Sequence, residues 1–227
     1  MFTDHLYKVV EPIWNSYIEH PFVKGIGEGT VDQEKFVHYM KQDYIYLIEY
    51  SRVFAIGSTK ANDLKTMTVF ANLLHGTMNF EMDLHREYAE KFGISNQELE
   101  EAEPSATMTA YTNYMISQSQ LGGVENAIAA VLACAWSYNW IGKEMAKWPG
   151  ALEHELYGNW VKMYSSDEFT AIAEDCKGLM NHVAADKSEE ELKRLEDIVV
   201  RTSYFEYMFW DMAKNKSMWP VKNLANV

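Results

Sequence analysis

The stretch Leu132-Ala-Cys-Ala-Trp-Ser-Tyr-Asn-Trp-Ile-Gly142 decides the fold class of this 227-residue chain. No charged residue occurs between Asn126 and Gly142, although charged residues are frequent elsewhere. Because the residues on both faces of this segment are mostly apolar, we expect a helix in the protein interior with neighbours on most sides. One face of it repeats at alternating steps of four and three residues, through Ala127, Val131, Cys134, Tyr138, Ile141 and Met145.

The rest of the chain also predicts helices, and no convincing alternating strand pattern occurs. Capping pairs at Thr30/Gln33, Ser165/Glu168 and Ser188/Glu191 predict three helix starts. The segment Gly25–Gly29 is expected to be a connector, and residues 97–103 a solvated connection. Because no repeat, linker or low-complexity stretch marks a boundary, we predict one all-α domain over residues 1–227. The remaining helices are expected over about residues 3–19, 30–58, 62–92, 104–121 and 157–164.

Composition excludes several classes of partner. The formal net charge of −13, without a basic cluster, would repel a phosphate backbone and argues against nucleic-acid binding. The longest apolar run, Ala127–Trp136, is too short to cross a membrane, and the N-terminus lacks a signal-peptide pattern. The two cysteines, Cys134 and Cys176, do not suggest a secreted disulfide framework. We therefore expect a reduced cytoplasmic protein.

Polar residues interrupt three of the inward-facing stripes. Asp43 follows Met40 on the face of the second long helix that should meet the core, and Glu206 occupies a similar position on the last helix. An isolated buried carboxylate is costly, so each should be paired, hydrogen-bonded or protonated. Cys134 and Tyr138 face the same way on the apolar helix, and Tyr46 lies one turn from Asp43. Such conflicts between polarity and pattern occur at functional sites, although each alone is commonly structural.

Metal and cofactor chemistry find little support in the sequence. Glu34/His38 and Glu81/His85 each share a helical face, but the Glu-x-x-His motif of di-iron bundles is absent and we expect ordinary solvated pairs. No thiolate cluster favours zinc. A haem protein remains an alternative because seven histidines are available, but no Cys-x-x-Cys-His motif occurs. Gly-x-Ser-x-Gly and P-loop motifs are also absent, so neither a metal nor a cofactor is predicted.

Five segments of the chain together carry a family resemblance: Gln42-Asp43-Tyr44, Ala110-Tyr111-Thr112, Cys134-Ala-Trp-Ser-Tyr138, Trp160-Val-Lys-Met-Tyr164-Ser-Ser and Tyr204-Phe-Glu206-Tyr-Met-Phe-Trp210. They resemble those of the TenA family, also called thiaminase II. The resemblance spans nearly the whole chain, and it implies a haem-oxygenase-like helical fold without haem, a homotetramer and a 4-aminopyrimidine substrate. It further implies hydrolysis of 4-amino-5-aminomethyl-2-methylpyrimidine to the 5-hydroxymethyl compound and ammonia, in thiamin salvage, together with cleavage of thiamin.

The same resemblance implies roles for individual residues. Cys134 is similar to the family nucleophile that adds to C6 of the pyrimidine, and Glu206 to the acid that protonates a ring nitrogen. Asp43 is similar to the carboxylate that recognises the 4-amino group. The substrate-binding tyrosines implied are Tyr46 and Tyr164 beside the ring, with Tyr111 and Tyr138 as hydrogen-bonding groups.

Two questions stay open on the sequence. The competing hypothesis is a non-enzymatic helical ligand-binding or interaction module in which Cys134 is merely buried, as free cysteines commonly are. Rapid alkylation with protection by ligand is the behaviour expected of a catalytic thiol. Thiamin and the aminomethylpyrimidine are both open as the physiological substrate.

Overall fold

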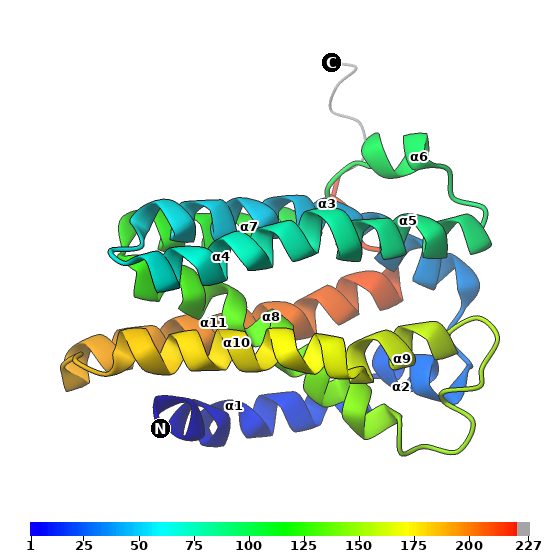
Figure 1. Cartoon of the computed structure of the whole chain (residues 1–227). Coiled ribbons are helices and arrows are strands. Elements are labelled where there is room, and N and C mark those ends of the chain that lie inside the picture. The colour runs from blue at the N-terminus through cyan, green and yellow to red at the C-terminus, as the bar shows by residue number, and fades with distance from the viewer. Residues whose placement is uncertain (222–227) are drawn as a thin grey trace.

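The computed structural model describes residues 1–221, in which every regular element is a helix (Figure 1), so the all-α prediction is confirmed. The helices α3, α4, α5 and α7 form one layer, and α10 and α11 lie between that layer and α1. The longer helices are α1 (Phe2–Glu19), α3 (Gln33–Lys60), α4 (Leu64–Gly76), α7 (Ala106–Leu121), α8 (Val124–Met145), α10 (Asp167–Ala184) and α11 (Glu189–Asn215). The shorter ones are α2 (Pro21–Glu28), the π-helix η1 (Thr77–Glu81), α5 (Met82–Lys91), α6 (Asn96–Glu100) and α9 (Gly158–Ser165).

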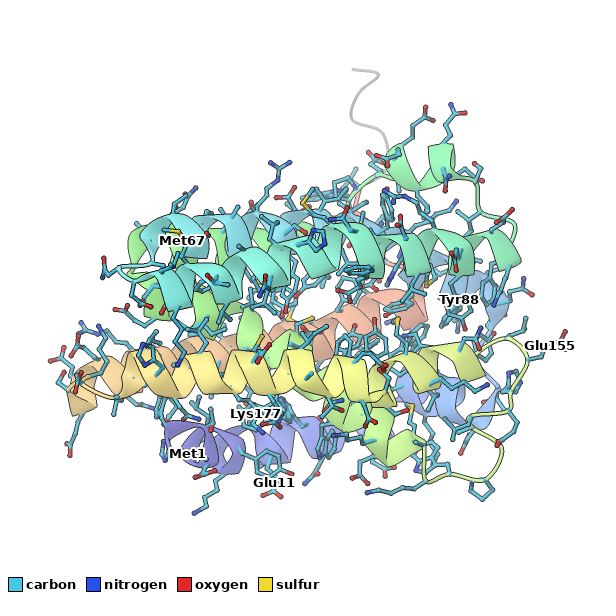
Figure 2. All side chains as sticks on the ribbon, viewed as in Figure 1. Met1, Glu11, Met67, Tyr88, Glu155 and Lys177 are labelled. Carbon is cyan, nitrogen blue, oxygen red and sulfur yellow. The ribbon has the colours of Figure 1, made fainter. Side chains whose placement is uncertain are left out.

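The central helix is α8, as its apolar sequence predicts. It packs against α1, α3, α7, α9, α10 and α11. Its residues from Ala127 to Ala133 have no exposed surface. Side chains fill the space between the helix layers (Figure 2), and Lys177 lies between α10 and α1 with Nζ 5.0 Å from the Trp136 ring centroid. The face that carries Cys134 and Tyr138 is therefore enclosed by other helices.

Gly142 sets the distance between α8 and the end of α9. A Cβ at this position would lie 2.6 Å from the carbonyl carbon of Tyr164 and 2.7 Å from the backbone nitrogen of Ser165. Because backbone atoms cannot move aside as a flexible side chain can, we expect Gly142→Ala to lower the free energy of unfolding by about 1–3 kcal/mol, as overpacking does. Chemical denaturation measures this loss.

Gly178 on α10 provides the matched control, because a Cβ there would meet nothing within 4 Å. In an open helical position alanine is favoured over glycine by up to about 1 kcal/mol, so Gly178→Ala should be neutral or stabilising. Similar losses in the two variants would show that the contact between α8 and α9 does not limit the side chain at position 142.

Several helix boundaries differ from those predicted. The segment Gly25–Gly29 is not a connector, since Pro21 begins α2 and Gly29 ends it with a positive φ of 71°. Thr30 does not cap α3; the Asp32 side chain accepts a hydrogen bond from the Lys35 backbone nitrogen at 3.2 Å. The first error arises because a short helix that ends in a left-handed glycine resembles a glycine-rich loop in sequence.

Other starts are displaced by one or two residues, and one predicted helix is interrupted. Pro104, predicted in the first turn of a helix, lies outside α7, which Ser105 caps, and Ser166 rather than Ser165 caps α10. The capping box of Ser188 and Glu191 is confirmed. Part of the predicted connection at 97–103 is the short helix α6. The helix predicted over about 62–92 begins at Leu64 and contains the π-turn η1, which an α-helical period does not describe.

Within residues 1–221, no helix is both long and apolar enough to span a bilayer. The prediction of one domain over residues 1–227 stays a prediction, and residues 222–227 lie outside the described part of the chain.

Candidate active site

Cys134, Glu206 and Tyr111 form the first part of the candidate site. They come from α8, α11 and α7, three helices that pack on one another. The Tyr111 hydroxyl donates a hydrogen bond of 2.6 Å to Oε1 of Glu206, which is 2% exposed. Burial raises the pKa of Glu206 to about 8, against the opposing effect of hydrogen bonds from Tyr111 and Cys134. Glu206 is therefore largely protonated near neutral pH and can donate a proton.

The Cys134 thiol is neutral in the unliganded protein. Burial, followed by the negative charge of Glu206, raises the pKa of Cys134 well above its usual value, while a hydrogen bond with Tyr46 acts in the opposite direction. Cys134 is still partly exposed, because its side chain lines a cavity. By contrast, Cys176 is fully buried, and the two cysteines are not joined in a disulfide. Because this environment disfavours a thiolate before the reaction, Cys134 must lose its proton as it reacts.

Asp43 lies in a hydrogen-bonded network with a histidine that sequence reasoning missed. Oδ2 of Asp43 accepts hydrogen bonds from Nε2 of His85 at 2.6 Å and from the Tyr39 hydroxyl at 3.1 Å. The other ring nitrogen of His85, Nδ1, lies 3.2 Å from the carbonyl oxygen of Glu81. Because both neighbours are acceptors, both ring nitrogens of His85 must donate, which is the imidazolium form.

Electrostatics agree with that protonation state. Burial lowers the pKa of His85, but the hydrogen bond and charge of Asp43 and the charge of Glu81 together outweigh burial, so that the net pKa is raised. The expectation that Glu81 and His85 are a solvated surface pair is wrong: His85 is 3% exposed and pairs with Asp43 across helices. Their shared helical face was the available signal, but it did not show that η1 directs this face inward.

The four predicted tyrosines are buried around these groups. The ring centroids of Tyr46 and Tyr111 are 5.2 Å apart, on the side of Glu206. Those of Tyr138 and Tyr164 are 4.7 Å apart, and both rings contact Trp160, whose Nε1 donates to the hydroxyl of Tyr39. The predicted tyrosines therefore form two groups, one connected to Glu206 and one connected through Tyr39 to Asp43.

A cavity with room for about 100 Å³ of solvent opens beside Cys134. It lies among α3, α4, η1, α8 and α10, and polar groups at its wall include Thr77, Glu81 and Asp175. Its complete lining is Tyr50, Phe54, Asn72, Leu73, Gly76, Thr77, Glu81, Cys134, Ala135, Phe169, Ile172 and Asp175. The thiol is thus placed between a mostly apolar cavity that has a few polar groups on its wall and an enclosed group of carboxylic acid and phenols.

Within residues 1–221, no group of three or more His, Cys, Asp or Glu side chains has the geometry to hold a metal ion. Glu34 and His38 do not act as a pair, since Glu34 accepts a hydrogen bond from Lys216 at 2.6 Å. Nε2 of His38 instead lies 3.1 Å from Sδ of Met212.

The raised pKa of Glu206 predicts a specific pH dependence of stability. The folded protein retains a proton on Glu206 up to about pH 8, whereas a glutamate in the unfolded chain releases it near 4.5. The stabilisation is therefore full below pH 4.5 and is lost as the pH rises toward 8. Glu206→Gln removes this titrating group. The unfolding free energy of the variant minus that of the parent should therefore rise with pH between 4.5 and 8, by up to about 1.4 kcal/mol per pH unit.

Urea denaturation of both proteins at pH 5, 6.5 and 8 measures the difference. Other titrating groups occur in both proteins and largely cancel in this comparison. A difference that stays constant across the three pH values would place the Glu206 carboxylate at an ordinary pKa.

Comparison with known proteins places the geometry in context. The sequence pattern of the TENA/THI-4/PQQC family matches residues 7–216. An aminopyrimidine aminohydrolase of Halalkalibacterium halodurans is 50% identical, with coverage of 96% of this chain and 97% of the relative. One from Helicobacter pylori is 41% identical, with coverage of 93% and 97%.

Solved structures agree with the fold. A TenA homologue from P. horikoshii superposes with a TM-score of 0.87 at 28% identity, covering 95% of this chain and 99% of the other. A Shewanella denitrificans domain described as having a heme oxygenase-like fold superposes with a TM-score of 0.75 at 14% identity, covering 94% and 92%. The second comparison bears on the fold alone.

Proposed function

Because the chain belongs to the TENA/THI-4/PQQC family, as the resemblance in its sequence indicates, we propose that it is an aminopyrimidine aminohydrolase. Its substrate is 4-amino-5-aminomethyl-2-methylpyrimidine, and its products are the 5-hydroxymethyl compound and ammonia. The observation that carries the proposal is the position of a cavity-lining Cys134 beside a buried, protonated Glu206. A soft nucleophile and an acid in contact are what addition to an aromatic nitrogen heterocycle requires.

The first step forms a bond between Sγ of Cys134 and C6 of the ring. Glu206 gives its proton to N1 and receives the thiol proton, so the acid is restored and no separate thiolate forms. Addition destroys the aromaticity of the ring and leaves an enamine between C4 and C5. Protonation of N1 in the same step makes this addition feasible, and the raised pKa of Glu206 supports its role as the donor.

The second stage replaces the amine. The 4-amino nitrogen contributes its electron pair as the bond between the 5-methylene and the amine breaks, and ammonia leaves with the bonding electrons. Water adds to the exocyclic methylene, and expulsion of Cys134 restores the ring. Asp43, held by His85 and Tyr39, is suited to hold the 4-amino group that becomes an iminium. The phenols of Tyr46, Tyr111, Tyr138 and Tyr164 border the ring in this scheme.

Thiamin cleavage belongs to the same proposal. The adduct at C6 is identical, and neutral thiazole is the leaving group in place of ammonia. A homotetramer in the cytoplasm, a single domain and independence from metals and cofactors complete the proposal, in line with the family resemblance.

Ammonia release from the aminomethylpyrimidine, measured beside thiamin cleavage on one preparation, tests the proposed function. The hydroxymethyl product should appear in equal amount with ammonia. A protein that releases neither ammonia nor thiazole would favour the non-enzymatic binding module. Alkylation is a weaker test than the sequence suggested, because the raised pKa of Cys134 makes slow alkylation compatible with either role.

A further inference from the structure

Of the two carboxylates that line the cavity beside Cys134, neither of which has a role in the proposed reaction, Asp175 is exposed and the partly buried one is Glu81. It ends η1, in which the Met82 backbone nitrogen bonds to the carbonyl of Thr77, five residues earlier. This wider turn places Thr77 and Glu81 on the cavity wall together with Cys134. Single π-turns inside α-helices recur at functional sites because they redirect side chains.

The charge of Glu81 acts on both Cys134 and Asp43. It contributes to the raised pKa of Cys134, and Asp43 in turn contributes to the raised pKa of Glu81. Burial is the largest cause and brings the pKa of Glu81 to about 7, with the charge of His85 and a hydrogen bond with Thr77 opposing it. Near neutral pH this carboxyl group can therefore both accept and release a proton.

The atoms of the substrate impose an order on the groups around it. N1, C6, C5 and C4 follow one another in the ring, and in the proposed reaction Glu206 serves N1, Cys134 attacks C6 and Asp43 holds the amine on C4. The group that serves the 5-methylene must lie between Cys134 and Asp43, away from Glu206. Among residues 1–221, the cavity beside Cys134 has no lining residue from α11, the helix of Glu206, whereas it does contain Glu81.

We infer that Glu81 is a further catalytic residue, which binds the 5-aminomethyl group as its ammonium ion and takes the proton from the water that replaces it. The inference rests on the proposed function. It adds a cation-binding position to the site and names the chemical class of leaving group for which the site is built.

The proton balance closes around this residue. The ammonium ion leaves as neutral ammonia, so no proton is needed when the carbon–nitrogen bond breaks. Water then forms the carbon–oxygen bond and gives its proton to the Glu81 carboxylate. Glu81 passes that proton to ammonia, which departs as ammonium, and the carboxylate is restored. Aminomethylpyrimidinium and water thus become hydroxymethylpyrimidine and ammonium, with charge conserved.

Equilibrium binding provides the test, in a Cys134→Ser background that prevents turnover. Calorimetry compares the aminomethylpyrimidine with the hydroxymethylpyrimidine, which has the same size but no positive charge. The protein with Cys134→Ser alone should bind the aminomethylpyrimidine roughly 10- to 100-fold more tightly than the hydroxymethylpyrimidine, as expected for a hydrogen bond between charged groups. Adding Glu81→Gln, which preserves size, should reduce that preference to about 1 while changing the affinity of the hydroxymethyl compound less than about threefold.

Glu87→Gln is the matched control, because Glu87 is exposed on α5 and should leave the preference intact. In the protein with Cys134 present, Glu81→Gln should also slow ammonia release roughly 10²- to 10⁴-fold, the range for loss of a general base. A preference for the ammonium ligand that survives Glu81→Gln would overturn the inference and leave the proposed function standing. If the protein with Cys134→Ser alone bound neither pyrimidine, the proposed function itself would fail.

Discussion

Cys134→Ser is expected to reduce ammonia release by at least about 10³-fold, in line with the removal of a nucleophile. The hydroxyl is nearly the same size as the thiol but a much poorer nucleophile toward ring carbon. The surrounding hydrogen-bonding groups, among them Tyr46 and Glu206, remain in place. Binding of the pyrimidine should therefore persist, so that kcat falls far more than affinity. Steady-state rates, calorimetry and thermal melting on one preparation separate these quantities.

Cys176→Ser is the matched control for that result. Cys176 is fully buried in α10 and burial raises its pKa to about 12. Its replacement should lower stability by about 1–3 kcal/mol, because the new hydroxyl lacks a prepared partner, and should leave kcat nearly unchanged. A folded Cys134→Ser protein that turns over like the parent would eliminate the covalent mechanism.

Glu206→Gln should lower kcat roughly 10²- to 10⁴-fold, the usual contribution of a general acid. Glutamine keeps the size of the side chain and an oxygen that can accept the hydrogen bond from Tyr111, but it cannot deliver a proton. Affinity for the pyrimidine should change little, because the contacts of the ring with the tyrosines are preserved. The ratio of kcat to Kd for parent and variant gives the effect on chemistry alone.

Glu196→Gln serves as the control on the same helix, since Glu196 is also buried but pairs with Lys193 and His5 in the N-terminal part of α11. It should retain full turnover. If Glu206→Gln kept the parent kcat, Cys134 would remain the nucleophile and the acid would have to be another group, of which Asp43 is the nearest candidate in the proposed scheme.

Much of the fold could be predicted because apolar periodicity is a local property. The interior position of α8 follows from a charge-free segment, and Asp43 and Glu206 are identified by their places on inward stripes. Helix starts at Gln33, Ala106 and Asp167 were displaced by one or two residues, since several nearby residues can serve as caps and tertiary packing selects one.

His85 and Glu81 could not be assigned correctly for a different reason. A regular α-helical period carried through residues 62–92 does not give the direction in which their shared face points. The π-turn at Thr77–Glu81 inserts one residue and so rotates the residues that follow it about the helix axis. Nothing local in the sequence specifies the turn. The partner that holds His85 in the interior, Asp43, is 42 residues away in the chain. Long-range pairing of this kind requires the three-dimensional structure.

The protonated thiol has a consequence for the durability of the protein. Peroxides attack cysteine as the thiolate, so a nucleophile that is ionised at rest is exposed to oxidative damage whenever the enzyme is idle. The raised pKa of Cys134 keeps the ionised fraction small in the unliganded protein. In the proposed reaction the sulfur loses its proton only as it bonds to the pyrimidine. The sulfur of Cys134 is then reactive only while the substrate is bound. The bound substrate also occupies the space through which an oxidant would reach the sulfur.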